Sequence, residues 1–231
     1  MCGRTSLAVD PSVLSDIFDV TVTQGVEDYV PQYNIDPSDG LVAVRNTDPE
    51  VAVVIDWGFI PEWADDPDEV ATPINARSGS VMESGMFRQS FKSKRCLLIA
   101  DGFYEWKGRR GSKQPYRILR ADGNPFAFAG IWSRWEENGT TRDTAAILTT
   151  EPNNVVGDIH DRMPVMLARD EHEAWLNGDT ETARELLDAF PADEVEAYPV
   201  SKRVNNPGFE SPELFEAIDI GDQSELGEFG S

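Results

Sequence analysis

Apolar residues in the middle of the chain form short runs that favour β-strands. The runs are rich in Val, Ile and Leu and are separated by turn signals containing Gly, Pro, Asp or Asn. The turn signal at Asp48-Pro49 divides the first two runs and predicts a hairpin. We expect strands over residues 41–46, 51–59, 96–100, 115–121, 125–132, 144–150, 163–167 and 196–200.

Helical spacing appears in fewer places. Asp10 and Pro11 supply a cap and a first-turn proline ahead of an apolar stripe. Apolar residues from Met82 to Phe91 recur at intervals of four and predict a second amphipathic helix. Later helices are expected over residues 171–176, 180–190 and 210–217. The pattern predicts an α+β protein, with an antiparallel, barrel-like β core flanked by helices. We expect one domain over residues 1–220 and a frayed acidic tail over residues 221–231.

Charge is distributed unevenly along the chain. The net charge is −22, which at face value argues against a polyanionic partner. Residues 77–120, however, hold eleven basic and three acidic side chains, whereas residues 204–231 hold seven acidic and no basic ones. Residues 77–120 are therefore suited to binding an anion, although the chain as a whole is negative. The overall acidic excess, with 15 Arg against 5 Lys, also leads us to hypothesise a halophilic source.

Several classes of protein are disfavoured. No apolar run is long enough for a membrane span, and residues 1–10 lack the apolar core of a signal peptide, so we expect a cytoplasmic protein. Two cysteines and two histidines do not form a disulfide framework or a metal site, and we expect neither metal nor cofactor. Cys96 and Trp63 are expected in the core, and His172 on a solvated helix face.

Cys2 is the first candidate for chemistry. Removal of Met1 would leave Cys2 with a free α-amine and a thiol, whose ordinary pKa values near 8 make both partly reactive at neutral pH. Together these groups capture an aldehyde as a Schiff base and then a five-membered thiazolidine. Alternatively, the thiolate would attack an acyl substrate with the amine as base. A cysteine at this position by itself is weak support for either reaction.

Three further segments carry polar side chains suited to a site. Asn75 and Arg77 are two residues apart, so an extended strand would direct both to one face. Glu105 stands among apolar neighbours, where burial would raise its pKa towards that of a general acid or base. His160 and Arg162 repeat the spacing of two. Taken singly, each segment also fits a structural role in a turn, an ion pair or a helix end.

Taken together, the motifs MCGR, PxNAR, DGFYEW and HDRMP resemble the SOS response-associated peptidase family, also called abasic-site processing proteins. The resemblance runs from residue 1 to at least Pro164. It implies a β-rich fold, a basic groove for single-stranded DNA, and self-removal of Met1. It also implies that Cys2 forms a covalent crosslink with the aldehyde of an abasic site. A lyase activity is left open.

The resemblance also implies roles for the catalytic residues. Cys2 would be the nucleophile, and Asn75 would orient it by hydrogen bonding. Glu105 would move protons during Schiff-base formation and ring closure, and His160 would protonate the deoxyribose ring oxygen.

Five more residues are implied for DNA binding. Arg4, Arg77 and Arg162 would hold the phosphates beside the lesion. Trp106 would pack on a nucleotide, and Asn34 would line the same pocket. The expected partner is single-stranded DNA containing abasic sites, bound by a monomer.

Two other functions fit part of the pattern. Glutaminases with an N-terminal nucleophile also begin Met-Cys-Gly, but they need a second synthase domain, for which this chain has no room. A non-covalent DNA-binding module would use the same residues only to line a pocket.

Overall fold

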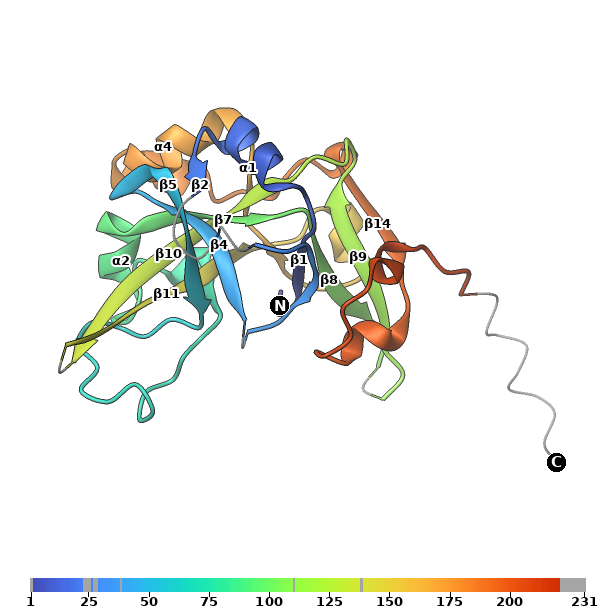
Figure 1. Cartoon of the computed structure of the whole chain (residues 1–231), viewed down its shortest axis with the longest axis horizontal. Helices are drawn as coiled ribbons and strands as arrows, with labels where there is room; N and C mark the ends of the chain where they lie inside the picture. The colour runs from blue at the N-terminus through green and yellow to red at the C-terminus, as the bar shows by residue number, and fades with distance from the viewer. Residues whose placement is uncertain are drawn as a thin grey trace.

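The computed structural model describes residues 2–22, 26, 29–37, 39–109, 111–137 and 139–220. The predicted tail over residues 221–231 and Arg110 of the basic segment lie outside the described residues. Strands form the body of the molecule and short helices lie at its periphery (Figure 1). Among the described helices, none has both the length and the apolar composition that crossing a membrane requires.

A closed barrel forms the larger part of the structure. Among the described residues, the ring consists in spatial order of β4 (Gly40–Arg45), β5 (Asp48–Trp57), β11 (Thr140–Thr150), β10 (Phe126–Glu137) and β7 (Arg95–Ala100). Neighbouring strands are antiparallel except β5 and β11, whose parallel pairing places Trp57 opposite Ala145 and closes the ring. The predicted antiparallel, barrel-like core is confirmed.

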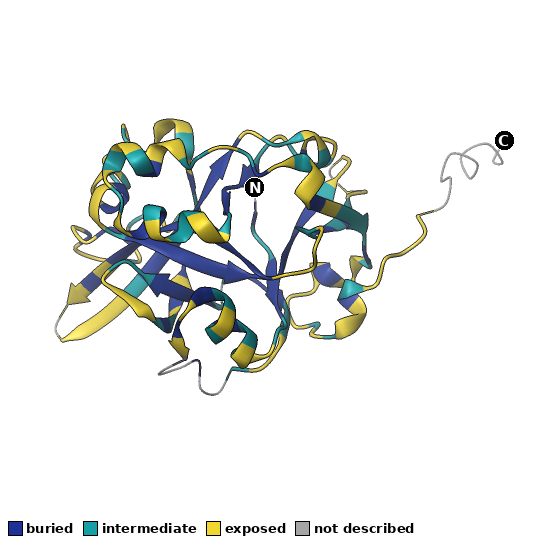
Figure 2. Ribbon diagram, turned by 90° about the horizontal axis from the view of Figure 1, so that it is seen from above, coloured by how far each residue is buried: buried dark blue, intermediate teal, exposed yellow. Residues whose placement is uncertain are grey.

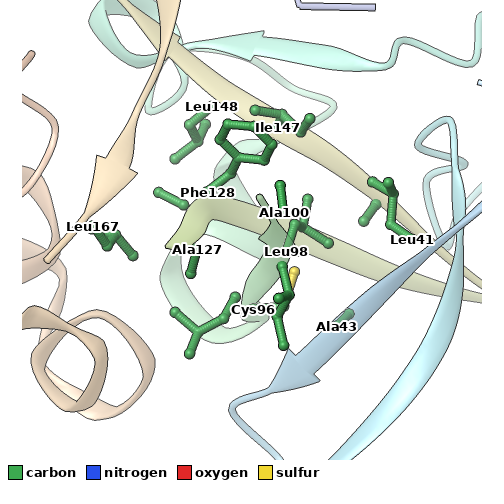
Figure 3. Packing of buried hydrophobic residues seen from close by; sticks show 14 of the residues in the cluster. Leu41, Ala43, Cys96, Leu98, Ala100, Ala127, Phe128, Ile147, Leu148 and Leu167 are labelled. Atoms are coloured by element: carbon green, nitrogen blue, oxygen red, sulfur yellow. The ribbon is translucent and has the colours of Figure 1, made fainter. Parts of the chain in front are cut away.

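The barrel interior is filled by small and branched side chains. Cys96 and Leu98 of β7 lie beside Ala43 of β4 and Phe128 of β10 (Figure 3). Cys96 is fully buried, as predicted, and burial raises the pKa of its thiol. Its partner across the strands is Gly130, where an added Cβ would lie only 2.7 Å from the Cys96 Sγ atom. Glycine is therefore required at this position for the strands to pack.

A second sheet lies against the barrel. Its strand order is β14 (Val195–Pro199), β9 (Gln114–Arg120), β8 (Gly102–Lys107), β1 (Thr5–Leu7) and β3 (Gln32–Ile35). In β8, Phe103 packs in the barrel core, whereas Tyr104 packs in a separate cluster with Val200 and Val204. This alternation is the two-residue period of a strand. It separates Glu105 from Trp106, which packs against the Tyr104 cluster.

The Asp101 carboxylate joins β1 to this sheet. It accepts hydrogen bonds of 2.6 Å from the Ser6 hydroxyl and from the Ala8 amide. On its other side it pairs with the Arg117 guanidinium at 3.1 Å, and all but 8% of the Asp101 side chain is buried. Gly102 makes room for this pair, because a Cβ there would lie 2.9 Å from the guanidinium. The pair fixes β1 in its place between β8 and β3.

The helices are shorter than predicted. Helix α1 (Pro11–Phe18) begins where expected, with the Asp10 carboxylate accepting from the Ser12 amide at 2.9 Å. Helix α2 covers only Arg88–Ser93, so the predicted helical start at Met82 is wrong. The Ser84 hydroxyl accepts from the Met86 amide at 3.2 Å and caps a new turn instead of continuing a helix.

The remaining elements are short. Helices α4 (His172–Asn177) and α5 (Thr180–Glu185) occupy part of the predicted ranges, and a 3-10 turn replaces the helix expected over residues 210–217. Exposed residues are concentrated on the helices and buried ones on the core strands (Figure 2). The other elements are β2 (Thr21–Val22), β6 (Asn75–Arg77), β12 (Met163–Pro164), β13 (Met166–Leu167), α3 (Asn154–Gly157), η1 (Ser78–Ser80), η2 (Arg169–Glu171), η3 (Ala192–Glu194), η4 (Lys202–Asn205) and η5 (Pro212–Phe215).

Two side chains lie elsewhere than predicted. Trp63 is 62% exposed on the surface connection between β5 and β6, so its expected place in the core is wrong. His172 is largely buried and stacks on Phe18, with ring centroids 5.4 Å apart, so it is not a solvated residue. Burial, followed by the charge of Arg169, lowers the pKa of His172 from 6.5 to about 4.

His172 should therefore make the fold sensitive to acid. Its folded pKa lies below its ordinary value, so its contribution is complete above pH 6.5 and is lost as the pH falls towards 4. The loss amounts to about 3 kcal/mol of unfolding free energy. Urea unfolding between pH 7 and 4 should show a smaller acid loss for His172→Gln than for the wild type. The same loss in both proteins would contradict this assignment.

Candidate functional site

Cys2 lies just before β1, which pairs with β8 and β3 in the second sheet. In Figure 1, β1 runs beside β8, and Thr5 pairs with Phe103 across the two strands. Cys2, three residues before Thr5, is fully buried, and its Sγ lies 3.9 Å from the Arg4 carbonyl oxygen. Burial, and after it the negative charge of Glu105, raises the pKa of the Cys2 thiol. The thiol is therefore protonated at neutral pH.

Asn75 contacts the backbone of Cys2 directly. Strand β6 runs parallel to β11, with Asn75 opposite Ile147. From there the Asn75 amide nitrogen donates a 2.8 Å hydrogen bond to the Cys2 carbonyl oxygen. The Asn75 side-chain oxygen is also buried and accepts no hydrogen bond from the described residues. Asn75 therefore fixes the position of Cys2 and keeps one acceptor available.

Glu105 is the buried carboxylate of the site. It lies on the same face of β8 as Phe103, which packs in the same core cluster as Cys2, and only 2% of it is exposed. Burial raises the pKa of Glu105, and nearby positive charges, including that of His160, oppose the shift. A carboxyl group in this environment exchanges protons nearer to neutral pH than an exposed one does.

His160 follows α3, whose first turn is capped by the Asn153 side chain at 2.9 Å from the Val156 amide. The His160 Nδ1 atom lies 3.0 Å from both the Arg162 amide nitrogen and an Asp161 carboxylate oxygen. A neutral ring accepts from the amide, whereas a protonated ring donates to the carboxylate. Both protonation states of His160 thus have a partner.

Two guanidinium groups flank Thr149 at the end of β11. Arg162 donates to the Thr149 carbonyl at 2.6 Å and to the Glu151 carboxylate at 3.0 Å. Arg77 lies opposite Thr149 in the β6–β11 pairing and is exposed, with no ion pair to a described residue. The pairing of β6 with β11 places Arg77 opposite Thr149, to which Arg162 also binds. Two arginines from distant segments therefore lie at one strand end. Arg77 is the more available of the two for a phosphate.

Arg4 and Asn34 form a structural pair. The Arg4 guanidinium donates to the Asn34 side-chain oxygen at 3.1 Å and lies 3.7 Å from Asp36. Asn34 is fully buried, and its amide nitrogen donates to the carbonyl oxygens of Asn206 and Phe209. Asn34 therefore positions Arg4 and holds residues 206–209.

Trp106 lies on the opposite face of β8 from Glu105. Its indole nitrogen donates a 2.7 Å hydrogen bond to the Asn205 side-chain oxygen.

The structure brings Cys2, Asn75 and Glu105 together. His160 lies near enough for its positive charge to oppose the rise in the pKa of Glu105. Among the described residues, no group of three or more His, Cys, Asp or Glu side chains could hold a metal ion.

The family model described as SOS response associated peptidase (SRAP) matches residues 1–207. The chain belongs to the SRAP family. The protein named abasic site processing protein YoqW from Bacillus subtilis is 39% identical over 223 residues, which cover 94% of this chain and all of YoqW. The abasic site processing protein HMCES from Xenopus tropicalis is 30% identical over 263 residues, covering 94% of this chain and 78% of HMCES.

The fold agrees with that of a solved structure. A protein from Bacteroides thetaiotaomicron superposes with a TM-score of 0.86 at 24% identity, covering 94% of this chain and all of the other. The family predicted from the four motifs and the α+β fold predicted from the hydrophobic pattern are both confirmed.

Sequence reasoning missed two residues of this SRAP site. Thr149 links Arg77 and Arg162, and Asn205 holds the Trp106 ring. Neither has a recognisable signal, because threonine is common in strands and Asn205 is 99 residues from Trp106. Only the folded chain brings them to the site.

Replacing Asn34 should destabilise the SRAP fold and also remove the hydrogen bond that positions Arg4. Asn34→Ala leaves the Asn206 and Phe209 carbonyls without a donor and is expected to lower the unfolding free energy by about 2 to 4 kcal/mol. Urea unfolding gives the value. Asn206→Ala is the matched control, because it keeps the backbone carbonyl and should cost much less. Equal losses in the two variants would contradict the role of Asn34.

Proposed function

We propose that this protein captures abasic sites in single-stranded DNA through a covalent thiazolidine formed by Cys2. The observation that carries the proposal is the hydrogen bond from Asn75 to the Cys2 carbonyl, together with a buried Glu105 near enough for its charge to raise the pKa of the Cys2 thiol. Hydrolysis of the Met1–Cys2 peptide bond by the protein itself would first free the α-amine. The names of YoqW and HMCES as abasic site processing proteins support this substrate.

Capture begins with opening of the sugar. An abasic deoxyribose is mainly a closed hemiacetal, and the amine reacts with the open aldehyde. His160 gives a proton to the ring oxygen as the C1′ hydroxyl loses one, which breaks the C1′–O4′ bond. The two hydrogen-bonded states of the His160 Nδ1 atom suit a group that loses and regains a proton.

The α-amine of Cys2 then attacks the aldehyde carbon. Water leaves and a C=N bond forms. The thiol adds to the same carbon, and its proton passes through Glu105 to the nitrogen, which closes the thiazolidine ring. The raised pKa of the Cys2 thiol favours this order, since the amine can react while the thiol is still protonated. The net reaction joins an aldehyde and an aminothiol and releases one water molecule.

DNA is held by the residues around this centre. Arg77 and Arg162 bind backbone phosphates at the end of β11, and Arg4, directly before β1, binds another. Trp106 packs on a base or sugar. The protein acts as a monomer in this proposal. Its two rivals, a glutaminase and a non-covalent DNA-binding module, predict no bond to DNA.

Of the two cysteines, only Cys2 should be needed for the covalent product. Incubation with single-stranded DNA containing an abasic site should give a band that resists denaturing electrophoresis, and Cys2→Ala should abolish that band but retain DNA binding. Cys96→Ala is the matched control: it removes the other thiol, buried in the barrel, and should keep the band. A wild-type protein that releases ammonia from glutamine, or that binds DNA without forming the band, would overturn the proposal.

Glu105→Gln should slow crosslinking roughly a hundredfold, because an amide cannot carry the proton. The raised pKa of Glu105 also adds an acid limb to the one that protonation of the α-amine produces in both proteins. The carboxylate is protonated at a higher pH than its ordinary 4.5, so the wild-type rate should already fall above that value on acidification. Rates of band formation between pH 5 and 8 measure both effects. An unchanged acid limb in Glu105→Gln would remove Glu105 from proton transfer.

A further inference from the structure

Arg162 is held between a buried partner and an exposed one. Its Nη2 atom donates to the Thr149 carbonyl oxygen at 2.6 Å and to the Thr149 hydroxyl oxygen at 3.2 Å, and Thr149 is fully buried. Its Nη1 atom donates to the Glu151 carboxylate at 3.0 Å. The side chain of Arg162 is 16% exposed, whereas that of Glu151 is 83% exposed. The strand end therefore fixes the guanidinium, and a solvated carboxylate is paired with it.

The fold does not need Glu151 to orient Arg162. Both hydrogen bonds from the Nη2 atom go to Thr149, whose own hydroxyl donates to the Ala76 carbonyl oxygen at 3.4 Å. An ion pair with one member largely in solvent contributes little to stability. The Glu151 carboxylate can therefore move away from Arg162 while Thr149 keeps the guanidinium in place.

Glu151 instead changes what Arg162 can bind. A guanidinium uses the same N–H groups to bind a carboxylate and a phosphate. While the Glu151 carboxylate lies 3.0 Å from the Nη1 atom, it balances the charge of Arg162 and occupies one of its donors. An incoming phosphate must displace the carboxylate or lie beside it, where two negative charges repel each other.

Arg77 has no such competitor. It lies opposite Thr149 in the β6–β11 pairing, and it is exposed without an ion pair to a described residue. Two guanidinium groups at one strand end thus differ in their readiness for an anion. That of Arg77 is free, and that of Arg162 is neutralised by Glu151.

We propose that Glu151 competes with a DNA phosphate for Arg162 and so limits the affinity of the protein for strands that it has not crosslinked. Arg77 binds a phosphate without competition, and Arg162 binds one only after Glu151 has moved aside. This inference rests on the proposed function, to which it adds a residue that weakens non-covalent binding. The covalent complex does not depend on that affinity, because the bond to Cys2 outlasts the encounter.

Binding to an intact single-stranded oligonucleotide tests the competition, because a strand without an aldehyde cannot crosslink. Glu151→Gln keeps the size of the side chain and removes its charge. Fluorescence anisotropy in about 0.1 M salt should show a dissociation constant about threefold lower than that of the wild type, and the gain should shrink as salt is added. The matched control is Glu181→Gln, which removes an exposed carboxylate paired with Arg184 at 3.6 Å on helix α5. Its dissociation constant should equal that of the wild type.

Two further backgrounds show whether Arg162 carries the effect. In Arg162→Gln, the added Glu151→Gln substitution should leave the affinity unchanged, whereas in Arg77→Gln it should still tighten binding about threefold. Equal gains in both backgrounds, a gain in the Glu181→Gln control, or an unchanged or weaker affinity for Glu151→Gln would overturn the inference. Glu151→Gln alters only an exposed side chain, so its result is decisive even if Arg162→Gln does not fold.

The proposed function is judged by a separate measurement. If the wild type forms no crosslink with a strand containing an abasic site, the proposed function fails, while anisotropy with the intact strand still decides the role of Glu151. If the crosslink forms and Glu151→Gln binds no more tightly than the wild type, only the competition is wrong.

Discussion

The site depends on the hydrogen bonds and the ion pair made by the buried Asp101 carboxylate. It binds the Ser6 hydroxyl, the Ala8 amide and the Arg117 guanidinium, and so joins three strands of the second sheet. Removing one partner of such a pair leaves an uncompensated buried charge, which costs several kcal/mol. The arrangement therefore holds β1 in a single register. Because Cys2 lies three residues before Thr5, the same pair also anchors the segment that carries Cys2.

Burial then sets the chemistry at Cys2. The barrel and the second sheet exclude water from the thiol and from Glu105, and both pKa values rise as a result. Asn75 fixes the backbone of Cys2 at this buried position.

The basic side chains of residues 77–120 have two roles, which the net charge of the segment does not distinguish. Arg95 and Arg117 are buried and bind backbone carbonyls or Asp101, so they hold the fold together. Arg77 and Lys113 remain exposed without an ion pair to a described residue. Of the basic side chains in this segment, only those that stay exposed and without an ion pair can therefore bind an anion.

The sequence by itself determined the family and the β-rich core. Short apolar runs are read correctly as strands because their period is local, and the four motifs carry their own spacing. Local patterns failed at Met82, where Ser84 caps a new turn, and at His172, whose burial against Phe18 depends on a distant helix. Only the tertiary structure decided that Asn34 supports Arg4 and that Asn205 holds Trp106. Those contacts join residues far apart in the chain, and no local pattern encodes them.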